Sequence, residues 1–144
     1  MIEQDTIKLL KECDAGVKMG ISSIDEVLDH VESDELKKEL MNSKKQHELI
    51  KQDIELLLQC YHDDGKEPNM FAKSMSWMKT NVMLSMDESD QRIADLMYDG
   101  CNMGVKSLNQ YLNQYVAASE KVKKICKDII EIESKLAIAI RRYL

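Results

Sequence analysis

The chain contains few of the residues that interrupt helices. Its 144 residues include one proline and five glycines, and aromatic residues make up only 5%. Hydrophobic residues account for 44% and charged residues for 32%. Because helix breakers are scarce and helix-forming residues are abundant, the composition predicts an all-α protein. A chain of this length is expected to fold as one domain, residues 1–144.

Three further absences limit the expected partners and compartment. No apolar run approaches the roughly 20 residues of a membrane span, so no membrane partner is expected. The net charge of −6 argues against a nucleic acid or an anionic membrane surface as the main partner. The start of the sequence, Met-Ile-Glu-Gln-Asp, lacks the basic and apolar regions of a signal peptide, and this predicts a cytoplasmic location.

The cysteines show no spacing that would indicate a zinc ribbon or a thioredoxin-like site. Cys13, Cys60, Cys101 and Cys126 lie far apart and form no C-x-x-C pair. Each falls within a helical pattern. We therefore expect buried, reduced thiols that pack as small hydrophobic groups.

Residues at alternating spacings of three and four form two sets within the first 61 residues. This spacing places each set on one stripe of a helix, the stripe that packs against other helices. Asp14 lies near the middle of the first stripe, and Ser43 and His47 lie near the middle of the second. Buried polar groups cost free energy unless they are hydrogen-bonded. These inward polar residues are therefore the sharpest functional indication in the sequence.

The pattern predicts long helices over residues of about 3–31, 34–63 and 87–115, and a last helix after a turn near 116–119. Ser33 is expected to cap the second helix and Gly65 to end it. Ser85-Met86-Asp87-Glu88 fits a capping box at the start of the third long helix.

A shorter helical segment is expected over residues of about 68–84. At about 1.5 Å per residue it would reach about 25 Å, long enough to return the chain to the far end of a bundle. The preferred arrangement is therefore up-down-down-up, with the second and third long helices parallel. The alternative is that the segment continues the third long helix as a kinked extension.

Several short motifs resemble a known family. They are Leu-Leu-Lys-Glu-Cys-Asp-Ala-Gly near the start, the single Trp77, and Arg-Ile-Ala-Asp-Leu-Met-Tyr-Asp-Gly-Cys from residue 92. With the order of the helices, they resemble uncharacterised bacterial ferritin-like four-helix-bundle proteins over nearly the whole chain. The resemblance implies a ferritin-like four-helix bundle with a helical crossover between its second and third helices. It also implies a relationship to di-iron proteins, which place Glu residues and Glu-x-x-His motifs inside the bundle.

The sequence departs from that ligand pattern at most positions. Asp14 matches the carboxylate of the first helix, but Lys44 stands where Glu-x-x-His needs Glu before His47. Cys101 stands where an acidic residue is expected, and the last helix has no His. A ferritin-type di-iron site is therefore not expected, and the predicted cofactor is none.

The alternative to a protein without a cofactor is a divalent-metal site with fewer ligands than a ferritin-type di-iron site. With about 1.5 Å per residue and the crossover topology, Asp14, His47, Asp99 and Glu133 come within roughly 10 Å of one height in the bundle. The simpler interpretation is a hydrogen-bonded core histidine in a polar layer that sets helix register.

Three classes of function remain open. The preferred one is a non-catalytic bundle that binds a protein partner or itself, because the apolar stripes are intact and the di-iron ligands are missing. No residue spacing would position a nucleophile. Residues 68–86 are rich in apolar side chains, so a homo-oligomer interface is expected there, with Phe71, Trp77 and Met78 as candidates. The second class is a metal-binding protein or oxidoreductase with a degenerate carboxylate and His site. The third is a small-molecule carrier, which a buried cavity among Met75, Met78, Met97 and Met103 would favour.

Overall fold

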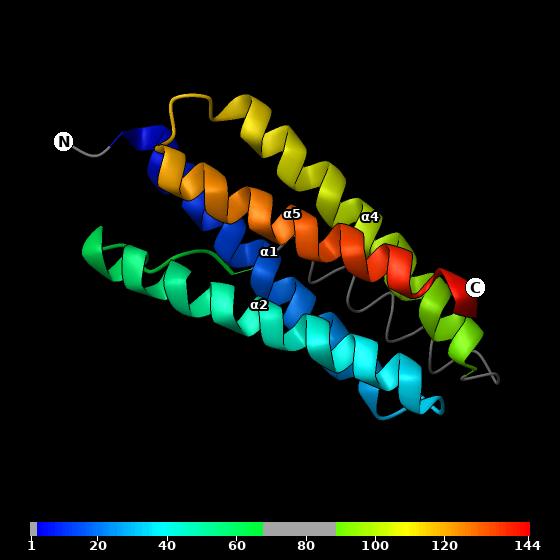
Figure 1. Cartoon of the computed structure of the whole chain (residues 1–144). Helices are drawn as coiled ribbons and strands as arrows, with labels where there is room; N and C mark the ends of the chain where they lie inside the picture. Colours follow the sequence, from blue (N-terminus) through cyan, green and yellow to red (C-terminus); the bar gives the residue numbers. More distant parts are fainter. Residues whose placement is uncertain (1–2, 68–88) are drawn as a thin grey trace.

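The computed structural model describes residues 3–67 and 89–144, and the described chain is helical without strands. It contains α1 (Gln4–Leu28), α2 (Asp34–Cys60), α4 (Asp90–Gln114), α5 (Glu120–Ala139) and a short 3-10 turn η1 (Arg141–Tyr143). The four α-helices pack together as one bundle (Figure 1). The all-α four-helix bundle expected from the sequence is confirmed.

The helices follow the up-down-down-up order. The carboxylate of Asp90, the first residue of α4, accepts hydrogen bonds from the main-chain nitrogens of Glu32 and Ser33, each at 2.9 Å. The starts of α2 and α4 therefore lie at the same end of the bundle and the two helices run parallel, as Figure 1 shows. At the other end, Asp5 accepts a hydrogen bond from the Ala117 nitrogen between α4 and α5. The predicted helical crossover falls on residues outside the described chain.

Serine caps set the start of three helices. Ser33, Ser89 and Ser119 each accept a hydrogen bond from the main-chain nitrogen three residues later, so each satisfies one free helix donor. The prediction for Ser33 is confirmed. The predicted start of the third long helix near residue 87 is wrong, because the Ser89 cap makes Asp90 the first residue of α4.

The end of α2 also differs from the expectation. His62 takes a left-handed conformation, with φ of 54°. The nitrogens of His62 and Asp63 bond back to the carbonyls of Gln59 and Leu58, and this arrangement is a Schellman motif. The prediction that Gly65 ends this helix is wrong. Gly65 lies in the turn that follows the helix, where its φ of +83° is a conformation that favours glycine.

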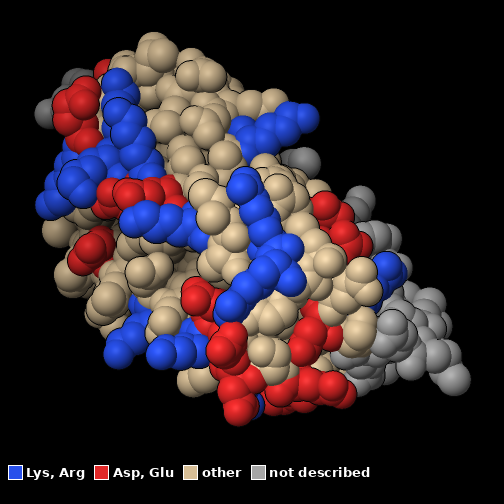
Figure 2. Space-filling view, turned by 45° about the vertical axis from the view of Figure 1, so that its right-hand side comes forward, with Lys and Arg blue, Asp and Glu red and all other residues tan. Residues whose placement is uncertain are grey.

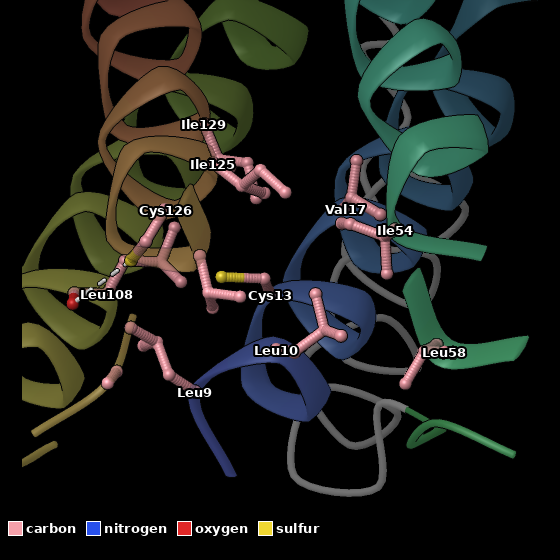
Figure 3. Packing of buried hydrophobic residues seen from close by; sticks show 12 residues of the cluster. Leu9, Leu10, Cys13, Val17, Ile54, Leu58, Leu108, Ile125, Cys126 and Ile129 are labelled. Atoms are coloured by element: carbon pink, nitrogen blue, oxygen red, sulfur yellow. Dashed lines mark hydrogen bonds between the residues drawn. The ribbon is translucent and has the colours of Figure 1, made fainter. Parts of the chain in front are cut away.

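The core consists of two apolar clusters, one toward each end of the bundle. The cluster near the starts of α2 and α4 includes Ile24, Leu40 and Leu136. The other includes Val17, Ile54 and Ile129, and Figure 3 shows part of its packing. Between the two clusters, at one height in the bundle, each of the four helices carries a residue that has no apolar side chain. These four residues, the mid-bundle layer, are Gly20, His47, Gly104 and Glu133.

The expectation of four buried cysteines is wrong at one position. All four are free thiols, but Cys60 is exposed whereas Cys13, Cys101 and Cys126 are buried. The inward stripe of α2 passes through Ile54 and Leu58, and this places Cys60 on the outer side of the last turn. Figure 3 shows Cys13 and Cys126 among the side chains of the second cluster.

Acidic residues crowd the end of the bundle where α1 meets α2. Asp25, Asp29, Glu32 and Glu35 are exposed there. Figure 2 shows acidic side chains gathered at the lower end of the visible face. Arg142 reaches the same end and forms a 2.7 Å ion pair with Glu35. Because all these groups are solvated, they contribute little to stability.

Candidate functional site

A buried histidine–carboxylate pair occupies the mid-bundle layer. His47 Nε2 of α2 lies 2.9 Å from Glu133 Oε1 of α5, and the His47 side chain is fully buried. His47 Nδ1 lies 2.7 Å from the main-chain oxygen of Ser43, one turn earlier. Both ring nitrogens therefore have partners, as a buried imidazole requires.

The contacts determine where the protons lie. The Ser43 carbonyl can only accept, so His47 Nδ1 donates to it. The other nitrogen faces a carboxylate, and a proton shared between Nε2 and Oε1 satisfies both groups. Burial alone would lower the pKa of His47. The hydrogen bond and charge of Glu133, with the Ser43 carbonyl, outweigh burial and raise the pKa above its ordinary value of 6.5.

The two glycines of the layer give this pair its space. A Cβ atom at Gly20 would lie 2.6 Å from His47 Nε2, closer than packed atoms approach. At Gly104 a Cβ atom would lie 3.7 Å from Glu133 Cδ, an ordinary contact. Gly20 is therefore required for the imidazole to occupy its position, whereas Gly104 leaves unfilled space in front of the carboxylate.

That space is part of a cavity of about 390 Å³ between α1 and α4. Its apolar wall is formed mainly by Met19, Ile24, Leu96, Met97, Met103 and Leu136. His47 and Glu133 form a polar region in the same wall, together with Cys101. Burial, followed by the charge and hydrogen bond of Glu133, raises the pKa of the Cys101 thiol, so it remains protonated.

The charged groups around the cavity are predominantly acidic. Glu12, Asp99 and Glu133 line it, and the described lining residues include no Lys or Arg. Glu12 forms a 2.5 Å ion pair with Lys66. Asp99 is exposed and has no ion pair within the described part of the chain.

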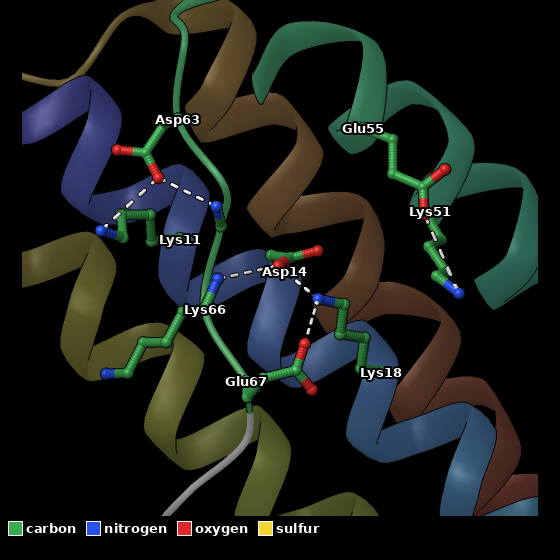
Figure 4. A network of polar contacts seen from close by, with 9 residues as sticks. Lys11, Asp14, Lys18, Lys51, Glu55, Asp63, Lys66 and Glu67 are labelled. Atoms are coloured by element: carbon green, nitrogen blue, oxygen red, sulfur yellow. Dashed lines mark hydrogen bonds and ion pairs between the residues drawn. The ribbon is translucent and has the colours of Figure 1, made fainter. Parts of the chain in front are cut away.

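Asp14 belongs to a separate polar network, shown in Figure 4. Its Oδ2 atom accepts 2.9 Å hydrogen bonds from Lys18 Nζ and from the main-chain nitrogen of Lys66. Glu67 also pairs with Lys18, at 3.1 Å, and Lys11 pairs with Asp63 at 3.5 Å. The network attaches residues 63–67, which we call the strap, to α1. Oδ1 of Asp14 is buried without a hydrogen-bond partner among the described groups.

The structure divides the four residues that the sequence grouped as a possible metal site. It joins His47 to Glu133 and places Asp99 at the wall of the same cavity. It places Asp14 in the strap network instead. Within residues 3–67 and 89–144, no group of three or more His, Cys, Asp or Glu side chains is arranged to hold a metal ion. The divalent-metal alternative stays a prediction, which elemental analysis of the purified protein would test.

Sequence reasoning missed Gly20, whose importance depends on the residue facing it from another helix. For the cavity, the signal available in the sequence was the four-residue spacing from Gly100 to Gly104, and both residues line it. The predicted interface residues Phe71, Trp77 and Met78 lie outside the described residues.

No protein-family model, curated protein or solved structure matches the chain. The ferritin-like resemblance therefore stays a prediction. No described helix combines the length and apolar character needed to cross a membrane.

Proposed function

We propose that this protein binds a small, largely apolar molecule in the cavity between α1 and α4, without acting on it chemically. The cavity of about 390 Å³ carries this proposal. Its volume lies within the range of about 300–1,000 Å³ that is usual for small-molecule sites. Apolar walls with a few convergent polar groups are also typical of such sites.

The alternative that the cavity is a packing defect is less consistent with the layer around it. Protein interiors contain few voids larger than a water molecule. At Gly104 even an alanine would fit, since its Cβ atom would lie 3.7 Å from Glu133 Cδ and 3.9 Å from Oε1. Glycine at a helix interior costs about 1 kcal/mol relative to alanine. A ligand that fills the space would explain why residue 104 is glycine rather than alanine. The unbranched Met side chains of the cavity wall can adapt to the shape of such a ligand.

A cavity-filling substitution tests the proposal. Gly104→Leu should place a side chain in the space next to Glu133 and weaken the binding of 1-octanol at least about tenfold, as measured by titration calorimetry. Asn102→Leu is the matched control, because residue 102 lies on the same helix, is exposed and does not line the cavity. Equal octanol affinity in the wild type and Gly104→Leu would contradict the proposal.

Self-association is a second candidate, and one observation on α2 supports it. Met41, Leu49 and Leu56 are 53%, 58% and 62% exposed. They lie eight and seven residues apart, a spacing that places them on one face of the helix. An exposed apolar stripe of this kind favours a contact with a second chain. The interface predicted around Trp77 stays a prediction.

A further inference from the structure

From the charges around the cavity we infer that its ligand is a protonated organic amine with an apolar body. This inference rests on the proposed binding function and specifies the ligand class. The apolar wall would hold the hydrocarbon part, since Met97, Met103 and Leu136 all contribute to it. The carboxylates would select the charge of the polar group.

Glu133 is the group in the cavity best placed to receive an ammonium. A carboxylate has acceptor sites for about four hydrogen bonds. His47 Nε2 occupies one of these sites, at 2.9 Å from Oε1. Acceptor capacity therefore remains on a carboxylate that is 8% exposed and lines the cavity. Charge-assisted hydrogen bonds to a largely dehydrated carboxylate are stronger than neutral ones.

The rest of the charge distribution favours a cation over an anion. With one shared proton, the His47–Glu133 pair has no net charge, and Lys66 offsets Glu12. Asp99 then leaves uncompensated negative charge at the wall, while no described lining residue is Lys or Arg. The hydroxyl groups of Ser107 and Tyr111 also line the cavity and can serve a ligand of either charge. The negative charge would repel a carboxylate ligand and attract an ammonium.

Three molecules with the same hydrocarbon chain test this inference: octylamine, 1-octanol and octanoate. Titration calorimetry on the full chain at neutral pH should show octylamine binding most tightly and octanoate most weakly, with at least about tenfold between them. Glu133→Gln should weaken octylamine binding about tenfold and change octanol binding less than about threefold. Glu131→Gln is the matched control, because Glu131 is exposed on the same helix and pairs with Lys135.

The outcomes separate this inference from the proposed function. If octanol binds and octylamine binds no more tightly, the amine inference is wrong and the binding function stands. If octanoate binds most tightly, the inference is also wrong. If none of the three binds, the proposed function itself fails. Should Glu133→Gln unfold, Asp99→Asn offers a second test at an exposed position, where octylamine affinity should fall about threefold and octanol affinity should not change.

Discussion

At the scale of single residues, the site depends on the absence of a Cβ atom at two positions. Gly20 and Gly104 are both helical glycines of the mid-bundle layer, but their surroundings differ. A Cβ atom at Gly20 would lie 2.6 Å from the His47 ring, whereas one at Gly104 would lie at an ordinary contact distance of 3.7 Å from Glu133. The two glycines have the same intrinsic helix propensity, so the difference between their roles comes from the residues that face them on other helices.

The glycines of α1 give a paired prediction. Gly20→Ala should lower the free energy of unfolding by about 1–3 kcal/mol, because its Cβ atom would lie 2.6 Å from a ring held by two hydrogen bonds. Gly16→Ala should raise it by about 0.5–1 kcal/mol, since its Cβ atom would lie 3.7 Å from Leu108 and alanine favours the helix. Urea denaturation measures both. Equal effects of the two substitutions would show that the ring does not require Gly20.

The His47–Glu133 pair predicts a pH dependence of stability. The pKa of His47 is raised above 6.5 in the folded state, so the protonated ring stabilises the fold. This contribution should be complete below about pH 6.5 and be lost as the pH rises through the folded-state pKa. Urea denaturation of the wild type from about pH 6 to about pH 9 should therefore show a decline that is reduced in His47→Gln. Identical pH profiles would contradict the assignment.

At the scale of elements, the strap shows how a short loop becomes attached to a helix. Gly65 lies close to Asp14 Oδ2, and its positive φ allows the chain to turn there. The turn directs the Lys66 nitrogen at the same oxygen. Glu12 then receives the Lys66 ammonium at the edge of the cavity. The strap thus connects the end of α2 to the face of α1 that borders the cavity.

Removal of the Asp14 carboxylate should loosen the strap. Asp14→Ala should lower the free energy of unfolding by about 1–3 kcal/mol, because the Lys66 nitrogen and the Lys18 ammonium lose their shared acceptor. Glu67→Ala removes the exposed partner of Lys18 and should change stability by less than about 0.5 kcal/mol. Chemical denaturation of both variants tests this. A cost for Glu67→Ala as large as that for Asp14→Ala would contradict it.

At the scale of the whole molecule, the bundle combines two apolar clusters with a polar layer and a cavity between them. The clusters supply the burial that stabilises the fold. The layer contributes a single hydrogen-bonded pair and leaves space beside it. This division allows the middle of the bundle to accept a ligand while its ends remain packed.

The exposed stripe on α2 leads to a prediction about association. Light scattering at micromolar concentration should report the mass of two chains for the wild type. Leu49→Glu with Leu56→Glu should reduce that mass to one chain without unfolding, because both side chains are more than half exposed. Gln46→Glu, at another exposed position of α2, is the control. Trp77→Glu tests the interface predicted from the sequence in the same way. A wild-type monomer would contradict self-association.

The sequence by itself determined the helices and the inward residues. The three-and-four spacing is a local property, so it predicted α1, α2 and the burial of Asp14, Ser43 and His47. The length of the segment between the second and third long helices also predicted the parallel order of α2 and α4, which the contacts of Asp90 confirm.

Only the tertiary structure decided which polar groups meet. His47 pairs with Glu133, 86 residues away, and Asp14 pairs with the strap. The register between distant helices depends on their tilt and rotation and on their caps, and no local pattern encodes these. The cavity has the same origin: glycines on α1 and α4 create usable space only because packing brings them opposite the pair formed by α2 and α5.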